Sequence, residues 1–211
     1  MHFTPEMPEL LKALRENNSK EWFDLNRSRY KKQVSEPLKA LGAALAPAIE
    51  AIDPALQLKF SRPNRDTRFS KDKSPYHTVA WLVFRHEGEW SEKPAFYVEI
   101  SPSGWRYGMG FYAAKSRSLD PIRSRALQSP DRFLKALQAA EEAGFALQGE
   151  RRARPVKTPV GTPEALLPFF TMKNFYFVQI EPYTPLFFRP DLEGRIRLEF
   201  EALAPIYRLF K

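Results

Sequence analysis

A stretch between Arg62 and His77 holds the residues of this chain that are best suited to chemistry. It reads Arg-Pro-Asn-Arg-Asp-Thr-Arg-Phe-Ser-Lys-Asp-Lys-Ser-Pro-Tyr-His, with five cations and two carboxylates. Arginine presents a planar fork that matches a phosphate or a carboxylate, whereas lysine presents a point charge. A charge-assisted contact of this kind contributes about 1.5–3 kcal/mol. We therefore predict that the stretch binds an anion, and the residues expected to contact it are Arg65, Arg68, Lys71, Lys73 and Tyr76.

The same residues support a second interpretation, in which the charges pair with one another. Asp66 and Asp72 alternate with Arg65 and Arg68 along the chain, and a network among them would pin the loop to the helices that precede it. An exposed ion pair contributes only about 0–1 kcal/mol, so such a network needs partial burial to matter. Both interpretations stay open, because different arginines can serve different roles.

A metal-dependent phosphoesterase or nuclease is an alternative function. Asp66, Asp72 or Glu99 would hold Mg²⁺, since hard cations take carboxylate oxygens, and Lys73 or Arg68 would stabilise the developing charge. The chain has no Gly-x-Ser-x-Gly elbow, no Walker lysine motif and no His-Glu-x-x-His pair. It therefore carries no signature of a serine hydrolase, a P-loop NTPase or a zinc protease. The residues assign no catalytic side chain, no metal ligand and no cofactor.

The formal charge of +8 is concentrated in three segments. Residues 62–77, 115–125 and 150–157 each carry +3, so the rest of the chain sums to −1. If the segments converge, they form one electrostatic footprint for nucleic acid or another phosphate-bearing ligand. If they do not, they are separate loops that face water. The residues that would share a common ligand with the first segment are Arg106, Arg123 and Lys157. A non-enzymatic protein that docks an acidic partner is a further alternative, and the pattern specifies no oligomeric state.

The N-terminal part of the chain, about residues 4–54, reads as helical. Thr4-Pro5-Glu6 has the form of a helix start, and apolar residues then repeat at helical spacing to about Glu16. Asn18 resembles the first residue of a capping box for a second helix, whose aromatic residues are expected to face the core. Pro37 is expected to begin a third helix after a bend, because proline is tolerated in a first turn.

The remainder, about residues 55–211, reads as strands and later helices. Strands are expected at 56–60, 78–84, 95–100, 105–112, 145–147 and 174–180, and helices at 118–127, 129–144 and 191–210. The 78–84 strand is apolar on both faces, which indicates an interior strand covered on each side. Gly108 and Gly110 indicate a bulge or a close backbone approach, and Gly144 fits a helix end. We predict one α+β domain, residues 1–211, with a mainly antiparallel sheet of about four to six strands packed against N-terminal and C-terminal helices.

Several short motifs occur in a fixed order through nearly the whole chain. They are Asn17-Asn18 with Trp22-Phe23, the segment RDTRFSKDKSPY from Arg65 to Tyr76, Gly108-x-Gly110, Leu119 with Ile122-Arg123, and Lys157 with Pro159-x-Gly161. Together they resemble the bacterial family called domain of unknown function 2461. Thr162 stands where the family pattern has an aromatic residue, and Ala113-Ala114 where it has a proline. The resemblance implies a single-domain bacterial cytoplasmic protein and carries over no activity.

The composition also predicts a compartment. The chain has no cysteine, and no apolar run approaches the roughly 20 residues that span a bilayer. The N-terminal residues show neither the basic leader nor the apolar segment of an export signal. We therefore expect a cytoplasmic protein without disulfides and without a membrane partner.

Overall fold

The computed structural model describes residues 2–88, 92–111, 114–152 and 158–211. The α-helices are α1 (Glu6–Glu16), α2 (Lys20–Tyr30), α3 (Glu36–Ile52), α4 (Asp120–Gln128), α5 (Pro130–Glu142), α6 (Leu167–Thr171) and α7 (Leu192–Phe210). The strands are β1 (Gln57–Phe60), β2 (Ala80–Arg85), β3 (Ala95–Ser101), β4 (Gly104–Gly110), β5 (Ala146–Gln148) and β6 (Tyr176–Glu181). A π-helical turn, η1 (Lys31–Ser35), joins α2 to α3.

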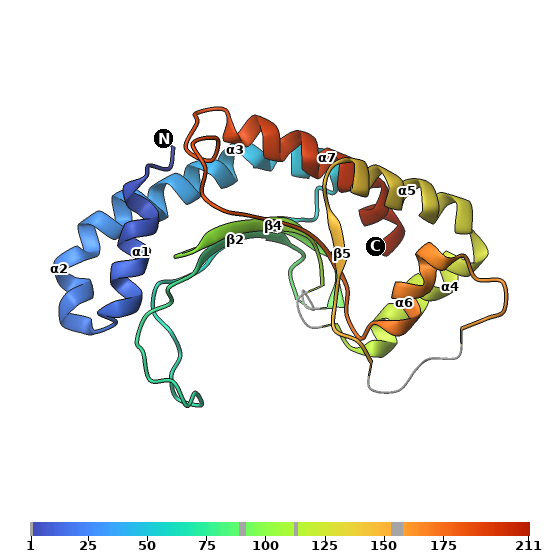
Figure 1. Ribbon diagram of the computed structural model, residues 1–211, viewed down its shortest axis with the longest axis horizontal. Helices are drawn as coiled ribbons and strands as arrows, with labels where there is room; N and C mark the ends of the chain where they lie inside the picture. Colours follow the sequence, from blue (N-terminus) through green and yellow to red (C-terminus); the bar gives the residue numbers. More distant parts are fainter. Residues whose placement is uncertain (1, 89–91, 112–113, 153–157) are drawn as a thin grey trace.

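The strands within the described residues form an antiparallel sheet in the order β1-β2-β3-β4-β6-β5. Helices α3 and α7 lie over its convex face, α1 and α2 lie at one end, and α4 and α6 lie at the other end (Figure 1). The concave face has none of the described helices over it. The predicted α+β fold is therefore confirmed. None of the described helices combines the length and the apolar character needed to cross a membrane.

The N-terminal helices follow the predicted spacing with two local differences. Ser19 rather than Asn18 caps α2, since the Ser19 hydroxyl accepts a hydrogen bond from the Trp22 N–H at 3.2 Å. The chain then stays helical through η1 into α3, without the break that we expected before Pro37. Pro37 lies in the first turn of α3, where its missing N–H and its ring are tolerated.

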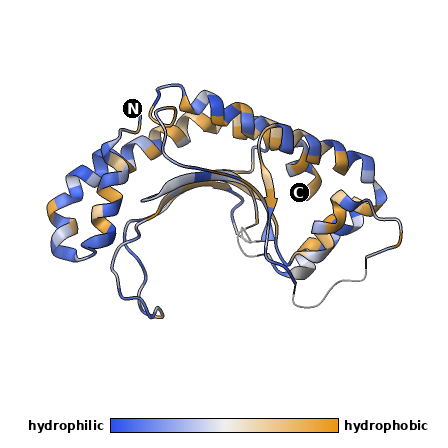
Figure 2. Ribbon diagram, in the orientation of Figure 1, coloured by the Kyte–Doolittle hydropathy of each residue, from blue (hydrophilic) through white to orange (hydrophobic). Residues whose placement is uncertain are grey.

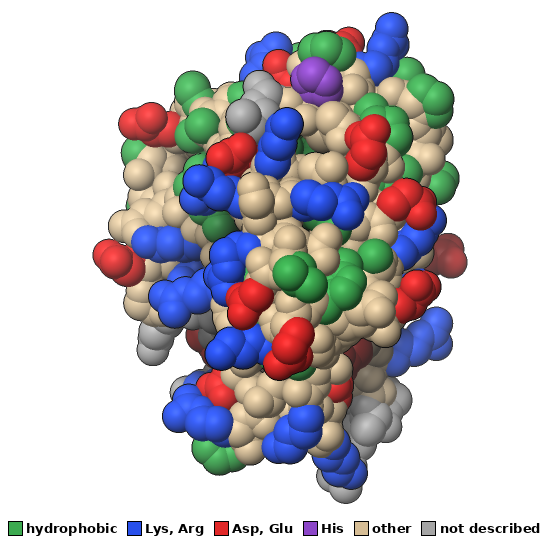
Figure 3. All heavy atoms as spheres, turned by 90° about the vertical axis from the view of Figure 1, so that its left-hand side faces the viewer, with side chains coloured by type: hydrophobic (Ala, Val, Ile, Leu, Met, Phe, Trp, Pro, Cys, Tyr) green, Lys and Arg blue, Asp and Glu red, His purple; other side chains and the backbone are tan. Residues whose placement is uncertain are grey.

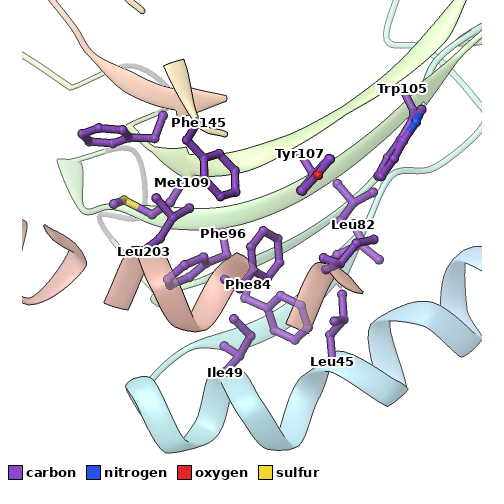
Figure 4. Packing of buried hydrophobic residues seen from close by; sticks show 14 of the residues in the cluster. Leu45, Ile49, Leu82, Phe84, Phe96, Trp105, Tyr107, Met109, Phe145 and Leu203 are labelled. Atoms are coloured by element: carbon purple, nitrogen blue, oxygen red, sulfur yellow. The ribbon is translucent and has the colours of Figure 1, made fainter. Parts of the chain in front are cut away.

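The core lies between the sheet and the helices over its convex face. Figure 4 shows Leu45 and Ile49 of α3 and Leu203 of α7 packed toward Phe84 and Phe96 of the sheet, and none of these side chains is more than 1% exposed. Burial of each large apolar side chain contributes roughly 1.5–3 kcal/mol. Hydrophobic and hydrophilic residues alternate along the helices, as expected for helices with one buried face (Figure 2). The same hydrophobic cluster includes residues from all the described α-helices.

β2 is not covered on both faces, contrary to the prediction. Leu82 and Phe84 point into the core and are at most 1% exposed, but Trp81, which precedes Leu82, is 37% exposed. Because alternate residues of a strand point to opposite faces, Trp81 lies on the concave face, which has none of the described helices over it. We call this concave face the open face.

Gly108 and Gly110 allow β4 and β6 to approach each other closely. A Cβ atom at Gly108 would lie 1.9 Å from Phe177 O, and one at Gly110 would lie 2.3 Å from the Tyr176 Cβ. No side chain fits at either position, so the predicted close backbone approach is confirmed. Gly144 has a φ of +87° directly after α5, as a glycine that ends a helix should have.

Candidate functional site

The predicted anion site, residues 62–77, joins β1 to β2 and forms an ordered loop with two arms. The Arg65 N–H donates to Pro75 O at 2.8 Å, and the His77 N–H donates to Pro63 O at 2.7 Å, so the backbone of one arm holds the other. Figure 1 shows that this loop extends away from both the sheet and the helices. We call it the basic loop.

Tyr76 anchors the basic loop to the core. Its side chain is 4% exposed, and its ring stacks on Phe23 of α2 with the ring centres 3.9 Å apart. The Asn18 side chain accepts a hydrogen bond from the Tyr76 N–H at 3.0 Å and donates one to Tyr76 O at 2.9 Å. Tyr76 was predicted to contact a ligand, but its ring is enclosed by the protein and has no surface to offer one. Phe23, one of the aromatic residues of α2, forms part of the surface that encloses the Tyr76 ring.

Arg65 is engaged by the basic loop itself. Its guanidinium contacts the Asp72 carboxylate and donates to Ser74 O at 3.3 Å, and its side chain is 21% exposed. Asp72 also accepts hydrogen bonds from the Ser74 N–H at 2.9 Å and the Ser74 hydroxyl at 2.6 Å. The bonds from Ser74, and after them the one from Arg65, hold the pKa of Asp72 well below its ordinary value. The Arg65–Asp72 contact agrees with the interpretation in which the charges of this stretch pair with one another. The pair joins two parts of the basic loop, however, and does not connect the loop to the helices.

The tip of the basic loop presents its other charges to solvent. Arg68 donates from Nε and Nη2 to both oxygens of Asp66, at 2.9 and 2.7 Å, which lowers the pKa of Asp66, yet the Arg68 side chain is 77% exposed. Phe69 is 95% exposed, and the Arg68 guanidinium lies 5.8 Å from its ring centre. Lys71 and Lys73 are also exposed. We call Arg68, Phe69, Lys71 and Lys73 the loop tip. On the side of the molecule shown in Figure 3, Lys and Arg side chains predominate on the lower part.

The other basic segments lie away from the basic loop. Residues 115–125 and 150–152 are found near α4 and α6, at the opposite end of the sheet (Figure 1). Arg123 is only 5% exposed and donates to Phe169 O and to an Asp120 carboxylate oxygen, each at 2.7 Å. It therefore fastens α4 to α6, and as far as the described residues show, the three segments do not form one patch. Lys157 lies outside the described residues.

The carboxylates considered for a metal ion are engaged by arginines. Asp66 and Asp72 each pair with an arginine of the basic loop, and Glu99 on β3 accepts hydrogen bonds from Arg106 on β4 at 2.7 and 2.9 Å. In the part of the chain that the structure describes, no three His, Cys, Asp or Glu side chains are arranged to hold a metal ion. The geometry therefore offers no observation that favours the phosphoesterase alternative.

The open face carries two exposed side chains that the sequence did not single out, Trp81 and Ile180, beside Glu99 and Arg106, which it did. Trp81 on β2 lies opposite Glu99 on β3, Glu99 lies opposite Arg106 on β4, and Arg106 lies opposite Ile180 on β6. These residues form one row across four strands, in which Trp81 is 37% and Ile180 is 63% exposed. Tyr97 on β3 lies next to this row and is partly buried, which raises the pKa of its hydroxyl. The only signal in the sequence was a bulky aromatic residue in a strand with apolar residues on both faces.

A buried polar network at the C-terminal ends of α3 and α7 was also missed. Asp53 is 1% exposed, and its Oδ2 accepts a hydrogen bond from the Tyr207 hydroxyl at 2.6 Å and contacts Lys211 Nζ at 2.8 Å. His86 Nε2 lies 3.2 Å from both Asp53 Oδ2 and the Tyr207 hydroxyl. Burial acts to raise the pKa of Asp53, but the hydrogen bonds from Lys211 and Tyr207 outweigh burial and lower it to about 2.

A second network links β4, β6 and α7. The Tyr107 hydroxyl donates to Glu199 at 2.6 Å, and Arg195 donates to Glu199 at 3.0 Å and to Glu181 at 3.1 Å. Arg195 also donates to the Tyr107 oxygen at 2.9 Å, so one guanidinium joins two carboxylates and a phenol. The arginine compensates the repulsion between the two glutamates, which gives this network a structural role.

The comparison with protein families gives one result. A family model described as "Conserved hypothetical protein (DUF2461)" matches residues 6–209. No curated protein matches the chain. The match extends from the first residue of α1 into the last turn of α7, and the description names no activity.

Proposed function

The chain belongs to the DUF2461 family, and we propose that it binds nucleic acid through the loop tip. The observation that carries this proposal is Phe69, a large apolar side chain that is 95% exposed between cations on an anchored loop. Leaving such a ring in water forfeits roughly 1.5–3 kcal/mol that burial would provide. Stacking on a base recovers part of that free energy, because every base offers an apolar face to an aromatic ring.

The charge around Phe69 fits a phosphate backbone. The basic loop carries +3, and the Asp66 and Asp72 carboxylates that reduce its charge lie within the loop. Arg68 is bound to Asp66, but this pair is exposed, and an exposed pair is worth only about 0–1 kcal/mol. A phosphate oxygen can therefore share or replace Asp66 on Arg68 at little cost. Neutralised phosphates release their counterions, which drives binding.

The shape of the loop favours a long anion over a small one. Sites for small ligands are concave and enclose most of the ligand. The loop tip projects from the fold, and its Phe69 and Arg68 side chains are 95% and 77% exposed, so it encloses nothing. A polymer needs no enclosure, because it contacts several cations in series. The ordered arms also reduce the entropy that binding would otherwise cost.

The proposal is tested by fluorescence anisotropy with a labelled oligonucleotide over a range of salt concentrations. We expect the wild type to bind with an affinity that falls steeply as salt rises. In the double variant Lys71→Ala/Lys73→Ala the slope of log K against log salt should decrease by about 1.4, which is roughly 0.7 for each lost phosphate contact on a single strand. Phe69→Ser should weaken binding with little change of the slope.

The matched control removes the same charge elsewhere. Lys39 and Lys135 are exposed. They belong to α3 and α5, two helices that Figure 1 shows away from the basic loop. Lys39→Ala/Lys135→Ala should leave the slope within error of the wild type. If both double variants change the slope equally, the effect reflects net charge and the proposed site is wrong. A thermal shift with inorganic phosphate that Lys71→Ala/Lys73→Ala abolishes, without oligonucleotide binding, would instead point to a small-anion site.

A further inference from the structure

The open face continues from the root of the basic loop. The Trp81 N–H donates to the Ser61 hydroxyl at 3.0 Å, and the Ser61 N–H donates to Trp81 O at 2.9 Å. Trp81 is therefore fixed where the basic loop joins the sheet. Because Leu82 points into the core, the neighbouring Trp81 side chain lies on the opposite, open face of the sheet.

Beyond Trp81 the open face provides rings and cations. Tyr97 on β3 and Tyr176 on β6 are partly buried, and both lie close enough to Arg106 on β4 to interact with its charge. The row from Trp81 to Ile180 crosses four strands, a span of about 14 Å at the usual strand spacing. Beside this row is a shallow hollow of about 230 Å³, which is lined in part by Arg106 and Ile180.

The charged side chains of the open face are mostly positive, as a surface that binds phosphates requires. Among the described strand residues it carries Lys59, Arg85 and Arg106 against the carboxylate of Glu99. Glu99 orients Arg106 through two hydrogen bonds. Bases stack on arginine planes as well as on aromatic rings, so Arg106 adds a second type of stacking group to the open face.

We infer that the open face is a stacking platform for single-stranded nucleic acid, with Trp81 as its principal stacking residue. This inference rests on the proposed function, and it adds the form of nucleic acid that is bound. A sheet that displays aromatic side chains holds two or three unpaired bases flat against it, whereas the bases of a duplex are enclosed in their own stack. The cations of the basic loop then hold the backbone while Phe69 stacks on one base, and the open face holds the bases that follow.

The test compares a labelled oligothymidylate with an oligoadenylate–oligothymidylate duplex on the full chain at about 50 mM salt. The wild type should bind the single strand more tightly than the duplex. Stacking of one base on an aromatic residue is worth about 1–3 kcal/mol, so Trp81→Leu should weaken single-strand binding roughly 5- to 150-fold. Duplex binding should not change, because it depends on the loop tip. Oligothymidylate should also quench tryptophan fluorescence in the wild type and less in Trp81→Phe, which keeps a ring for stacking.

The outcomes separate the two hypotheses. If neither nucleic acid binds the wild type, the proposed function is wrong. If both bind equally and Trp81→Leu affects neither, the proposed function stands and the stacking platform is overturned. Thermal unfolding of Trp81→Leu shows whether the variant is folded. If it is not, Trp81→Phe decides the question by its fluorescence, since quenching equal to the wild type would place the bases away from residue 81.

Discussion

Replacing Tyr207 by phenylalanine should destabilise the protein by about 1–2 kcal/mol at neutral pH. The Tyr207 ring packs against Phe96, with ring centres 5.2 Å apart, and would remain, so only the hydroxyl is lost. That hydroxyl donates at 2.6 Å to Asp53, which is 1% exposed. A hydrogen bond to a charged group is worth about 1.5–3 kcal/mol. The net lowering of the Asp53 pKa from its ordinary value of 3.8 to about 2, after the opposing effect of burial, corresponds to about 2 kcal/mol. Lys211 remains as a partner, but it is half exposed and therefore partly screened.

The pH dependence of this effect has a defined sign. The folded pKa of Asp53 is lowered, so the stability that Asp53 contributes is present above its unfolded pKa near 3.8 and is lost as the pH falls through about 2. Loss of the Tyr207 hydroxyl raises the folded pKa of Asp53. The difference in unfolding free energy between wild type and variant should therefore be largest above about pH 5 and should shrink toward pH 3.

Urea unfolding measured at several pH values tests this prediction, with Tyr183→Phe as the control. The Tyr183 hydroxyl bonds only neutral groups in the contacts described, accepting from Ser101 N–H at 3.1 Å and donating to Ser101 O at 2.7 Å. Tyr183→Phe should cost about 1 kcal/mol at every pH. The reasoning is refuted if Tyr207→Phe costs less than about 0.5 kcal/mol at neutral pH, or if its cost is as independent of pH as that of the control.

Three further effects are expected. Burial lowers the pKa of His86, so as the pH falls the unfolded state takes up a proton before the folded state does. The free energy of unfolding should therefore fall between about pH 7 and pH 5. In urea unfolding, His86→Gln should show a weaker decline than the wild type, and an equal decline would contradict this role of His86. Arg195→Met leaves the carboxylates of Glu181 and Glu199 without their cation. Because both glutamates are partly exposed, we expect the free energy of unfolding to fall by about 2–3 kcal/mol in urea unfolding. The loss should be smaller in acid, where the carboxylates are protonated. Gly108→Ala places a Cβ 1.9 Å from Phe177 O and should cost more than about 3 kcal/mol, whereas Gly194→Ala, with open space around it, should be close to neutral in the same measurement.

The basic segment was recognisable in the sequence, but the contacts of its individual residues were not predictable from the sequence. Composition is a property of the chain, so the concentration of charge between residues 62 and 77 was visible at once. Availability for a ligand depends on what else each side chain touches. Tyr76 is enclosed by Phe23 and clasped by Asn18, which lies 58 residues earlier, and Arg65 is held by the loop itself. Phe69 is the most exposed large apolar side chain of the basic loop. The sequence did not indicate this exposure, because exposure depends on which distant residues pack around a side chain.

Local physics determined most of the secondary structure from the sequence alone. The start of α1 and the glycine after α5 follow from backbone sterics and hydrophobic spacing, which involve only residues near one another in the sequence. The tertiary structure alone decided which face of the sheet is covered, and with it the exposure of Trp81. It also decided the contact between Asp53 and Tyr207, which are 154 residues apart, because no periodicity in the sequence records which distant polar groups must share a buried space.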